Sequence, residues 1–233
     1  MTDETLKGVL VVDKPAGWTS HDVVGKTRRL LGVKKVGHTG TLDPMATGVL
    51  VLLVGSATKQ AKHFENDDKR YLAEITFGRA TDSYDATGET TAEGDPELIV
   101  RRKLLETING FIGVTGQLPP MFSAVKVGGK RLYTLARKGE TIERKPRTVT
   151  IYSMDADVNG FPVITLDIHC SKGTYIRTIA HELGEKLGCP AHLSALRRTA
   201  SGRFIIEDAV DFMACAETGN AEILKEALLS PDI

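Results

Sequence analysis

Six consecutive apolar residues at positions 49–54 constrain the fold of this chain more than any other segment. Such a run predicts a buried strand, because a strand with one face in water would alternate apolar and polar side chains. The run follows a loop at 37–48 that is rich in glycine, threonine and proline and holds one carboxylate, that of Asp43. We therefore expect a loop that presents Asp43 from a rigid element of the core.

The residues alone leave two interpretations of Asp43 open. Aspartate before proline is common in turns, where its side chain accepts a hydrogen bond from its own backbone. The neighbours His38, Thr39 and Thr41, however, add polar groups that a simple turn does not need. Because the loop also follows a basic stretch at 26–35, the second interpretation is a carboxylate presented to a polyanion.

Composition argues against several classes of protein. No apolar run approaches the ~20 residues that cross a bilayer, and the N-terminus has no signal-peptide pattern, so we expect a cytoplasmic protein. The three cysteines are an odd number without a C-x-x-C spacing, which argues against a disulfide framework and a structural zinc site. We expect no metal ion, and the cysteines are interpreted as reduced packing residues.

The charges are balanced in total but unevenly distributed along the chain. There are 30 basic and 30 acidic residues, and the segment 126–147 has a strong excess of lysine and arginine. Acidic residues concentrate at 65–97 and after Glu207. This asymmetry is compatible with a basic groove on one face, since local potential guides a polyanion more than net charge does. Ordinary solvated charges explain any single run equally well.

Periodicity and turn residues predict a mixed order of helices and strands. The helix expected over 21–31 has Thr19 or Ser20 as its N-cap and Gly32 as its C-terminal stop. Further helices are expected over 56–64, 96–108, 132–138, 174–187 and 221–229, and strands over 8–12, 49–54, 71–77, 147–158, 163–170 and 193–204. The polar segment 79–95 lacks periodicity and is expected to be a long mobile loop. Because the order is not a βαβ alternation, we expect an α+β fold around an antiparallel-rich sheet.

Several blocks of sequence resemble one family. The run from Gly37 to Pro44 is similar to the catalytic motif of the TruB family of tRNA pseudouridine synthases, a Gly-His-x-Gly-x-Leu-Asp-Pro loop with one essential aspartate. Further blocks match in order at 8–15, 17–20, 69–71, 118–126 and 171–177. The resemblance covers nearly the whole chain. It implies the pseudouridine synthase fold, a mixed and mostly antiparallel central sheet flanked by helices and loops, with a central cleft.

The resemblance assigns the chemistry to Asp43 and Arg177. Asp43 is the expected nucleophile, and Arg177 would form an ion pair that keeps Asp43 ionised and fixes its rotamer. Arg177 lies in the first turn of its helix, where the helix dipole disfavours a cation, so a compensating carboxylate is expected. The family also suggests Asp85 as a partner of Arg177. From the residues alone, a surface arginine that reaches water or phosphate is the alternative.

The resemblance also assigns residues that contact the substrate. Tyr71 is expected to stack on the target base and is the candidate for removing the proton from C5, whereas the pattern alone favours a core tyrosine. His38 is assigned to holding the opened RNA and not to acid–base catalysis. Tyr175 is expected to pack near the site, and Leu196 to line the pocket.

The activity that the resemblance implies is isomerisation of the T-loop uridine of tRNA, at position 55, to pseudouridine. The target base must be flipped out of its stack, and no cofactor or metal is required. The expected partner is the T stem-loop of tRNA, bound by a monomer with no obligate protein partner and no membrane. Two alternatives are an RNA-binding module without catalysis and an aspartate-dependent glycosidase, which usually needs a second carboxylate.

The expected domain organisation is simple. Residues 1–206 are predicted to form the catalytic domain, and 207–233 a short acidic, helical extension. This extension is too short for the small C-terminal RNA-binding domain, called PUA, that longer members of the family carry.

Overall fold

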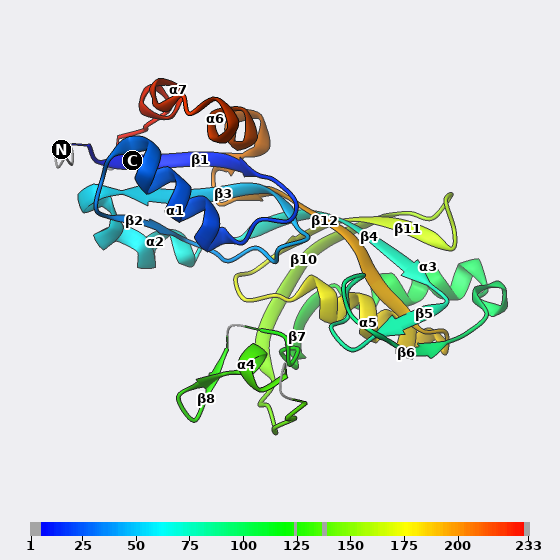
Figure 1. The fold of residues 1–233 in the computed structure, drawn as a ribbon. Coiled ribbons are helices and arrows are strands. Elements are labelled where there is room, and N and C mark those ends of the chain that lie inside the picture. Colours follow the sequence, from blue (N-terminus) through cyan, green and yellow to red (C-terminus); the bar gives the residue numbers. More distant parts are fainter. Residues whose placement is uncertain (1–5, 124, 137–138, 231–233) are drawn as a thin grey trace. The chain divides into compact units, whose positions relative to one another are not determined.

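The computed structural model describes residues 6–123, 125–136 and 139–230, and the chain divides into two compact units. The first unit contains both ends of the chain, Met1–Tyr71 and Leu196–Ile233, and the second contains Leu72–Ala195. The chain passes from one unit to the other within strands β4 (Lys69–Phe77) and β12 (Ala191–Ser201). The elements of both units are labelled in Figure 1.

Strand β3 (Thr47–Val54) is the central strand of the first unit. It pairs antiparallel with β1 (Gly8–Lys14) and with β2 (Val36–His38), and parallel with β12. Two short strands complete this part of the sheet, since β14 (Val210–Asp211) pairs with β1 and β13 (Phe204–Ile205) pairs with β12. All residues of β3 after the first are buried, which confirms the buried strand predicted from the apolar run.

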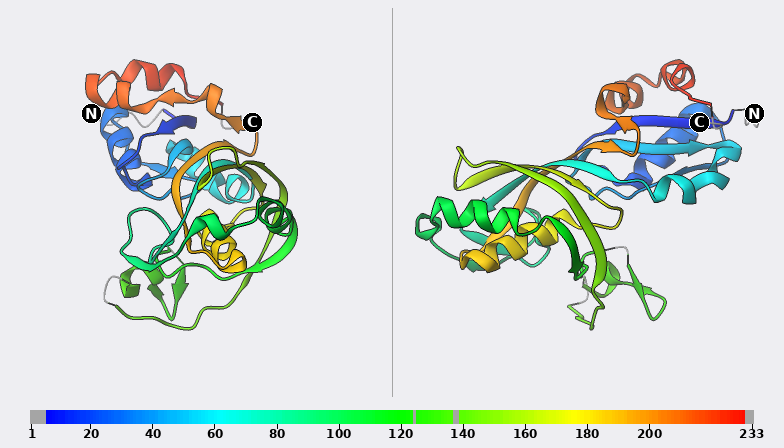
Figure 2. Two further views of the ribbon diagram at one scale, coloured as in Figure 1. Left: turned by 90° about the vertical axis from the view of Figure 1, so that its right-hand side faces the viewer. Right: turned by 180° about the vertical axis from the view of Figure 1, so that it is seen from behind.

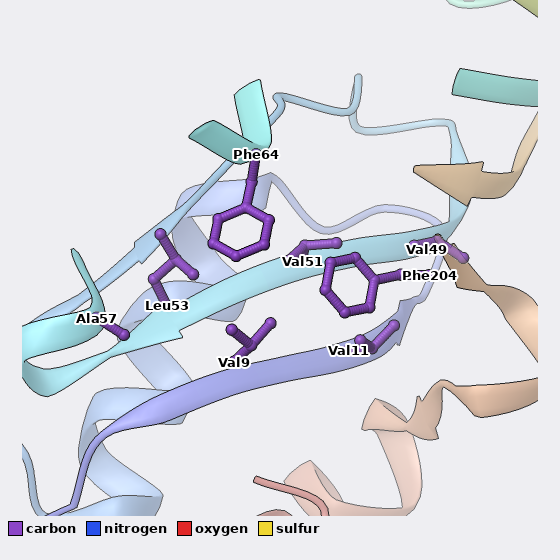
Figure 3. Packing of buried hydrophobic residues seen from close by; sticks show 8 residues of the cluster. All are labelled: Val9, Val11, Val49, Val51, Leu53, Ala57, Phe64 and Phe204. Carbon is purple, nitrogen blue, oxygen red and sulfur yellow. The ribbon is translucent and has the colours of Figure 1, made fainter. Parts of the chain in front are cut away.

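One face of β1 and β3 forms a hydrophobic core (Figure 3). Alternate residues of a strand share a face, so Val9 and Val11 of β1 point to the same side as Val49, Val51 and Leu53 of β3. The helical segments η1 (Gly55–Gln60) and α2 (Ala61–Glu65) cover this side together with β13. The cluster comprises Val9, Val11, Val49, Val51, Leu53, Ala57, Phe64 and Phe204. The intervening residues of the same strands are also buried, so the sheet is covered on both faces.

Three helices complete the first unit: α1 (Ser20–Leu31), α6 (Phe212–Thr218) and α7 (Ala221–Glu226). Helix α1 begins as predicted, with Thr19 as the N-cap in a capping box with Asp22, and ends at Gly32 in the left-handed conformation. Helix α6 contacts β1 and helix α7 contacts α1 (Figure 1). The short helical segment η3 (Ile206–Asp208) leads into β14.

The second unit contains an antiparallel sheet and two main helices. The strand order is β12-β4-β11-β10-β7, with β11 (Val163–Cys170), β10 (Arg147–Asp157) and β7 (Gly113–Gln117). Helices α3 (Arg101–Asn109) and α5 (Ile176–Leu187) lie side by side in both views of Figure 2. A small pair, β8 (Lys126–Val127) and β9 (Lys130–Arg131), leads to α4 (Leu132–Ala136). The predicted α+β fold with a mostly antiparallel sheet is confirmed.

Two predictions about local structure are wrong. Segment 79–95 contains a strand pair, β5 (Arg79–Thr81) and β6 (Thr90–Glu93), where a loop without structure was expected. Its turn is fixed by hydrogen bonds from backbone N–H groups to aspartate side chains, which leave no periodic pattern in the sequence. Pro96 opens only the short segment η2 (Pro96–Leu98), and α3 begins at Arg101 because Ile99 and Val100 are extended.

Three expectations from the sequence concern the described residues only in part or through what they lack. Residues 137 and 138, at the end of the predicted helix 132–138 and within the basic run 126–147, lie outside them. None of the described helices is long and apolar enough to span a lipid bilayer. Cys170, Cys189 and Cys215 are buried and form no disulfide among the described residues, in keeping with packing residues.

Gly48 allows the backbones of β3 and β12 to approach closely, and its substitution should be severely destabilising. A Cβ at this position would lie 2.2 Å from the carbonyl oxygen of Arg198, and the backbone φ of +100° disfavours any side chain. We expect Gly48→Ala to lower the free energy of unfolding by more than about 3 kcal/mol, measured by urea denaturation. Gly17→Ala is the control: its φ is +81° but a Cβ meets nothing within 4 Å, so a loss of only about 1–2 kcal/mol is expected. Equal losses would contradict the role of the close approach.

Candidate active site

Asp43 occupies the first position of a tight turn in the loop before β3. The N–H of Ala46 donates to the carbonyl oxygen of Asp43 at 3.1 Å, and Pro44 takes the second position, which its fixed φ favours. The preceding residue is tied to α1, because the N–H of Leu42 donates to the buried Oγ of Ser20 at 2.9 Å. Asp43 is half-buried in this turn. The turn interpretation and the interpretation as a presented carboxylate are therefore compatible.

A buried lysine anchors the turn of Asp43. The Lys14 side chain is fully buried, and its Nζ donates to the carbonyl oxygens of Trp18 at 2.6 Å, Pro15 at 2.7 Å and Pro44 at 3.2 Å. Burial lowers the pKa of Lys14 to about 8, and the charge of Asp43 opposes this fall. Lys14 therefore remains mostly cationic at neutral pH and places a positive charge in the electrostatic environment of Asp43.

Two arginines of β12 hold the ends of the same loop. Arg198 is buried and donates through Nε to the carbonyl oxygen of Val49 at 2.7 Å and through its guanidinium to that of Gly40 at 3.1 Å. Arg197 forms a bidentate pair with Asp13 of β1 at 2.6 and 3.2 Å, and it donates to Oγ1 of Thr47, at the end of the loop, at 3.3 Å. The loop that carries Asp43 is thus fixed by charged hydrogen bonds, which are stronger than neutral ones.

His38 ends β2 and lies at the start of this loop. Burial, followed by the charges of His21 and Arg198, lowers the pKa of His38 to about 4. Its ring meets that of His21 edge to face, with 5.3 Å between centroids. Within the described part of the chain its buried Nδ1 has no hydrogen-bond partner. The imidazole of His38 is therefore neutral at pH 7.

Arg177 is fixed in the second unit by a carboxylate and two carbonyl groups. Its guanidinium is 3.5 Å from Oδ2 of Asp85 and donates to the carbonyl oxygens of Ser83 at 3.1 Å and Phe122 at 2.8 Å. Both charged side chains are buried. The carboxylate expected to offset the helix dipole at Arg177 is therefore present, and it is Asp85. The ion pair of Arg177 with Asp43 stays a prediction, since the two residues belong to different units.

Asp85 is itself rigidly held, which orients it toward Arg177. Its Oδ1 accepts hydrogen bonds from the hydroxyls of Ser83 at 2.8 Å and Thr87 at 2.6 Å, and from the N–H of Thr87 at 3.0 Å. The other carboxylate oxygen pairs with Arg177. The turn between β5 and β6 is thus the element that positions this pair, and the pairing that the family resemblance suggested for Asp85 is confirmed.

The remaining predicted site residues lie on ordered elements. Tyr71 is buried on β4 and Leu196 is buried on β12, whereas Tyr175 immediately precedes α5. The side-chain amide of Gln117 exchanges two hydrogen bonds with the backbone of Tyr175, at 2.7 and 3.0 Å. Their roles toward a substrate stay predictions. Among the described residues, no group of three or more His, Cys, Asp or Glu side chains could hold a metal ion.

Sequence reasoning missed the groups that anchor the loop of Asp43 and the backbone of Tyr175. Lys14 and Asp13 lie in a block that matches the family, but charge and spacing gave them no role. The sequence gives no indication that Arg198 is buried, because the pattern around a buried arginine of a strand does not differ from that around an exposed one. Gln117 was likewise unassigned.

Two solved structures share the fold of this chain. A crystal structure of a Cbf5–Nop10–Gar1 complex aligns with a TM-score of 0.74 at 29% identity, over 97% of this chain and 60% of that one. A structure of an H/ACA RNP bound to a substrate RNA containing 2'-deoxyuridine aligns with a TM-score of 0.71 at 26% identity, over 97% and 59%. The chain thus spans about 60% of the length of these solved chains.

Sequence comparisons identify the family. The model for the N-terminal domain of TruB family pseudouridylate synthases matches residues 28–176, and the model for the C-terminal domain of tRNA pseudouridylate synthase B matches 177–231. A tRNA pseudouridine synthase B from Symbiobacterium thermophilum is 51% identical over 97% of this chain and 76% of its own length. One from Opitutus terrae is 45% identical over 96% and 92%. The chain belongs to the TruB family of pseudouridylate synthases, which confirms the predicted family, fold and enzyme class.

The depressed pKa of His38 predicts a pH-dependent stability. The unfolded chain takes up this proton near pH 6.5 and the folded chain only near pH 4, so the free energy of unfolding falls as the pH is lowered through this range. His38 should contribute up to about 3 kcal/mol to the fall. Urea denaturation at pH 7.5 and 4.5 should show a smaller fall for His38→Gln than for the unmodified chain. His63→Gln, which removes an exposed imidazole, should behave like the unmodified chain. An equal fall in the free energy of unfolding for all three proteins would contradict the lowered pKa of His38.

Removal of the Asp85 charge should destabilise the second unit. An amide in place of this carboxylate would keep an oxygen for the hydroxyl contacts but remove the buried negative charge that Asp85 places 3.5 Å from the guanidinium of Arg177. We expect Asp85→Asn to lower the free energy of unfolding by about 3 kcal/mol, measured by urea denaturation. Asp82→Asn, at an exposed position of the same turn, is the control and should change it by less than about 0.5 kcal/mol. Similar losses in both variants would show that the buried pair is not the cause.

Proposed function

We propose that this chain isomerises the T-loop uridine at position 55 of tRNA to pseudouridine, with Asp43 as the nucleophile. The observation that carries the proposal is the anchored turn of Asp43, in which a buried ammonium and a buried guanidinium hold backbone carbonyl groups of the loop that carries this half-buried carboxylate. The charge of Lys14 favours the ionised carboxylate, and a fixed turn limits the directions in which the side chain can point. The curated relatives, named tRNA pseudouridine synthase B, support tRNA as the substrate.

The proposed reaction needs no change in redox state. The Asp43 carboxylate attacks either C1′ of the ribose or C6 of the uracil, and the bond between N1 and C1′ breaks. The base rotates, its C5 bonds to C1′, and the bond between Asp43 and the substrate breaks, which restores the free carboxylate. The proton on C5 leaves, and N1 gains a proton. Atoms and charge therefore balance without a metal or cofactor.

The other site residues have distinct proposed roles. Arg177, fixed by Asp85, would pair with Asp43, and Tyr71 would stack on the target base and accept the proton from C5. A neutral His38 would contact the opened RNA, with Tyr175 and Leu196 lining the pocket. The uridine must leave its stack first, which costs a few kcal/mol that stacking in the pocket offsets.

Three further expectations belong to the same proposal. The enzyme would act as a cytoplasmic monomer on the T stem-loop, without an obligate protein partner. Residues 1–206 would carry the catalytic domain and 207–233 the acidic extension. The first compact unit contains residues from both of these ranges, so this functional division does not follow the units.

The nucleophile can be tested directly. We expect Asp43→Asn to abolish tritium release from tRNA labelled at C5 of uracil, because an amide cannot replace the attacking carboxylate, while binding of the tRNA remains measurable. Asp208→Asn, which removes an exposed carboxylate of the same unit, should release tritium at the unmodified rate. Substantial turnover by Asp43→Asn would refute the assignment. Release of free uracil by the unmodified enzyme would point to a glycosidase, and binding without release to an RNA-binding module.

A further inference from the structure

An open pocket beside α1 in the first unit has no role in the chemistry proposed for Asp43. Its volume is about 370 Å³, and its lining combines an indole, an imidazole, a guanidinium and a carboxylate. We call it the α1 pocket. Its lining residues are Gly17, Trp18, His21, Asp22, Gly25 and Arg29.

The floor of the α1 pocket contains a glycine in the middle of a helix. His21, Gly25 and Arg29 are spaced by four residues and so share one face of α1. Glycine is among the poorest helix formers, and a Cβ at Gly25 would meet no atom of the protein within 4 Å. Packing inside the protein therefore does not require this glycine. The missing side chain at Gly25 leaves a gap between the imidazole of His21 and the guanidinium of Arg29, where a flat ligand can approach the helix backbone.

The α1 pocket adjoins the anchored loop of Asp43. The ring of His21 contacts the ring of His38, with 5.3 Å between centroids. On the other side of the α1 pocket, Gly17 contacts the turn of Asp43: its N–H donates to the carbonyl oxygen of Pro44 at 2.8 Å. Lys14 bridges the same two segments through the carbonyl oxygens of Trp18 and Pro44. A ligand in the pocket would thus lie next to any RNA bound at His38.

The lining favours a nucleobase over a phosphate group. Indole, imidazole and guanidinium planes are the surfaces on which unstacked bases of RNA are held. Asp22 repels a phosphate but can accept a hydrogen bond from an exocyclic amine of a base. Thr19 holds only one of its carboxylate oxygens, Oδ2, in the capping box.

We propose that the α1 pocket binds an unstacked nucleobase of the same RNA, next to the target uridine in the bound strand. The inference rests on the proposed function only in requiring an RNA ligand. The target uridine itself remains assigned to Asp43. The α1 pocket is therefore a second base site that sets the register of the bound loop.

Trp18 provides a direct readout, because it is the only tryptophan of the chain. A base stacked in the α1 pocket should quench its fluorescence. The probe is an unmodified T-arm hairpin RNA, added to the full chain. We expect Gly25→Gln, which fills the pocket without removing a contact, to lose most of the quenching and to weaken binding by about tenfold. Arg29→Gln should weaken binding in the same direction, and it guards against a folding defect peculiar to the Gly25 variant.

The control and the RNA variants make the test specific. Ala214→Gln adds the same side chain at an exposed position of α6 and should bind like the unmodified chain. Replacing single bases near the target with abasic sites should identify one position whose loss weakens the unmodified chain about tenfold but has little further effect on Gly25→Gln. Unchanged quenching and affinity in Gly25→Gln would overturn the proposal. So would a Gly25 effect that depends on salt and on no base, which would indicate phosphate binding.

Failure of this inference can be distinguished from failure of the proposed function. If the unmodified chain releases no tritium but Gly25→Gln still loses the quenching, the proposed reaction is wrong and the base site stands. If tritium is released and Gly25→Gln quenches normally, the base site is wrong and the proposed reaction stands.

Discussion

The interaction on which the candidate active site depends is the buried ammonium of Lys14. A lysine without water around it must donate its protons within the protein, and here it finds three carbonyl oxygens on two segments distant in the sequence. Those contacts join the end of β1 to the turn that carries Asp43. The cost of burying the cation is visible in its lowered pKa, and the charge of Asp43 offsets part of it. The lysine that anchors the loop therefore also interacts favourably with the charge of the carboxylate on that loop.

The same principle organises the second unit around Arg177. A guanidinium in the first turn of a helix meets the positive end of the helix dipole, so it needs negative partners from elsewhere. They come from Asp85 and from the carbonyl groups of Ser83 and Phe122. Asp85 can serve because a network of hydroxyl and N–H donors fixes its other oxygen. In both units a buried cation holds backbone carbonyl groups in place, which is a rigid way to build a site from loops.

These cations also explain why loops rich in glycine can be well ordered. Flexible residues permit the close approaches, as at Gly48 against the backbone of Arg198, but they do not enforce them. Enforcement comes from charged hydrogen bonds to the loop carbonyls at Gly40 and Pro44. Gly25 differs from these positions, since it lies in a regular helix and faces open space. That contrast separates a glycine required by the fold from one available to a ligand.

The sequence by itself determined the buried strand at 49–54, the capped helix α1, the antiparallel-rich α+β class and, through its matching motifs, the family. These features depend on local periodicity, capping residues and motif order, which can be read along the chain. It failed at 79–95, where side chains of aspartate and threonine build the turn without any periodic pattern. Only the tertiary structure decided that Lys14 and Arg198 are buried, and it confirmed the pairing of Asp85 with Arg177 that the family resemblance had suggested. Burial and pairing of charges depend on which distant carbonyl and carboxylate groups the fold brings within hydrogen-bond distance, and no local pattern in the sequence carries that information.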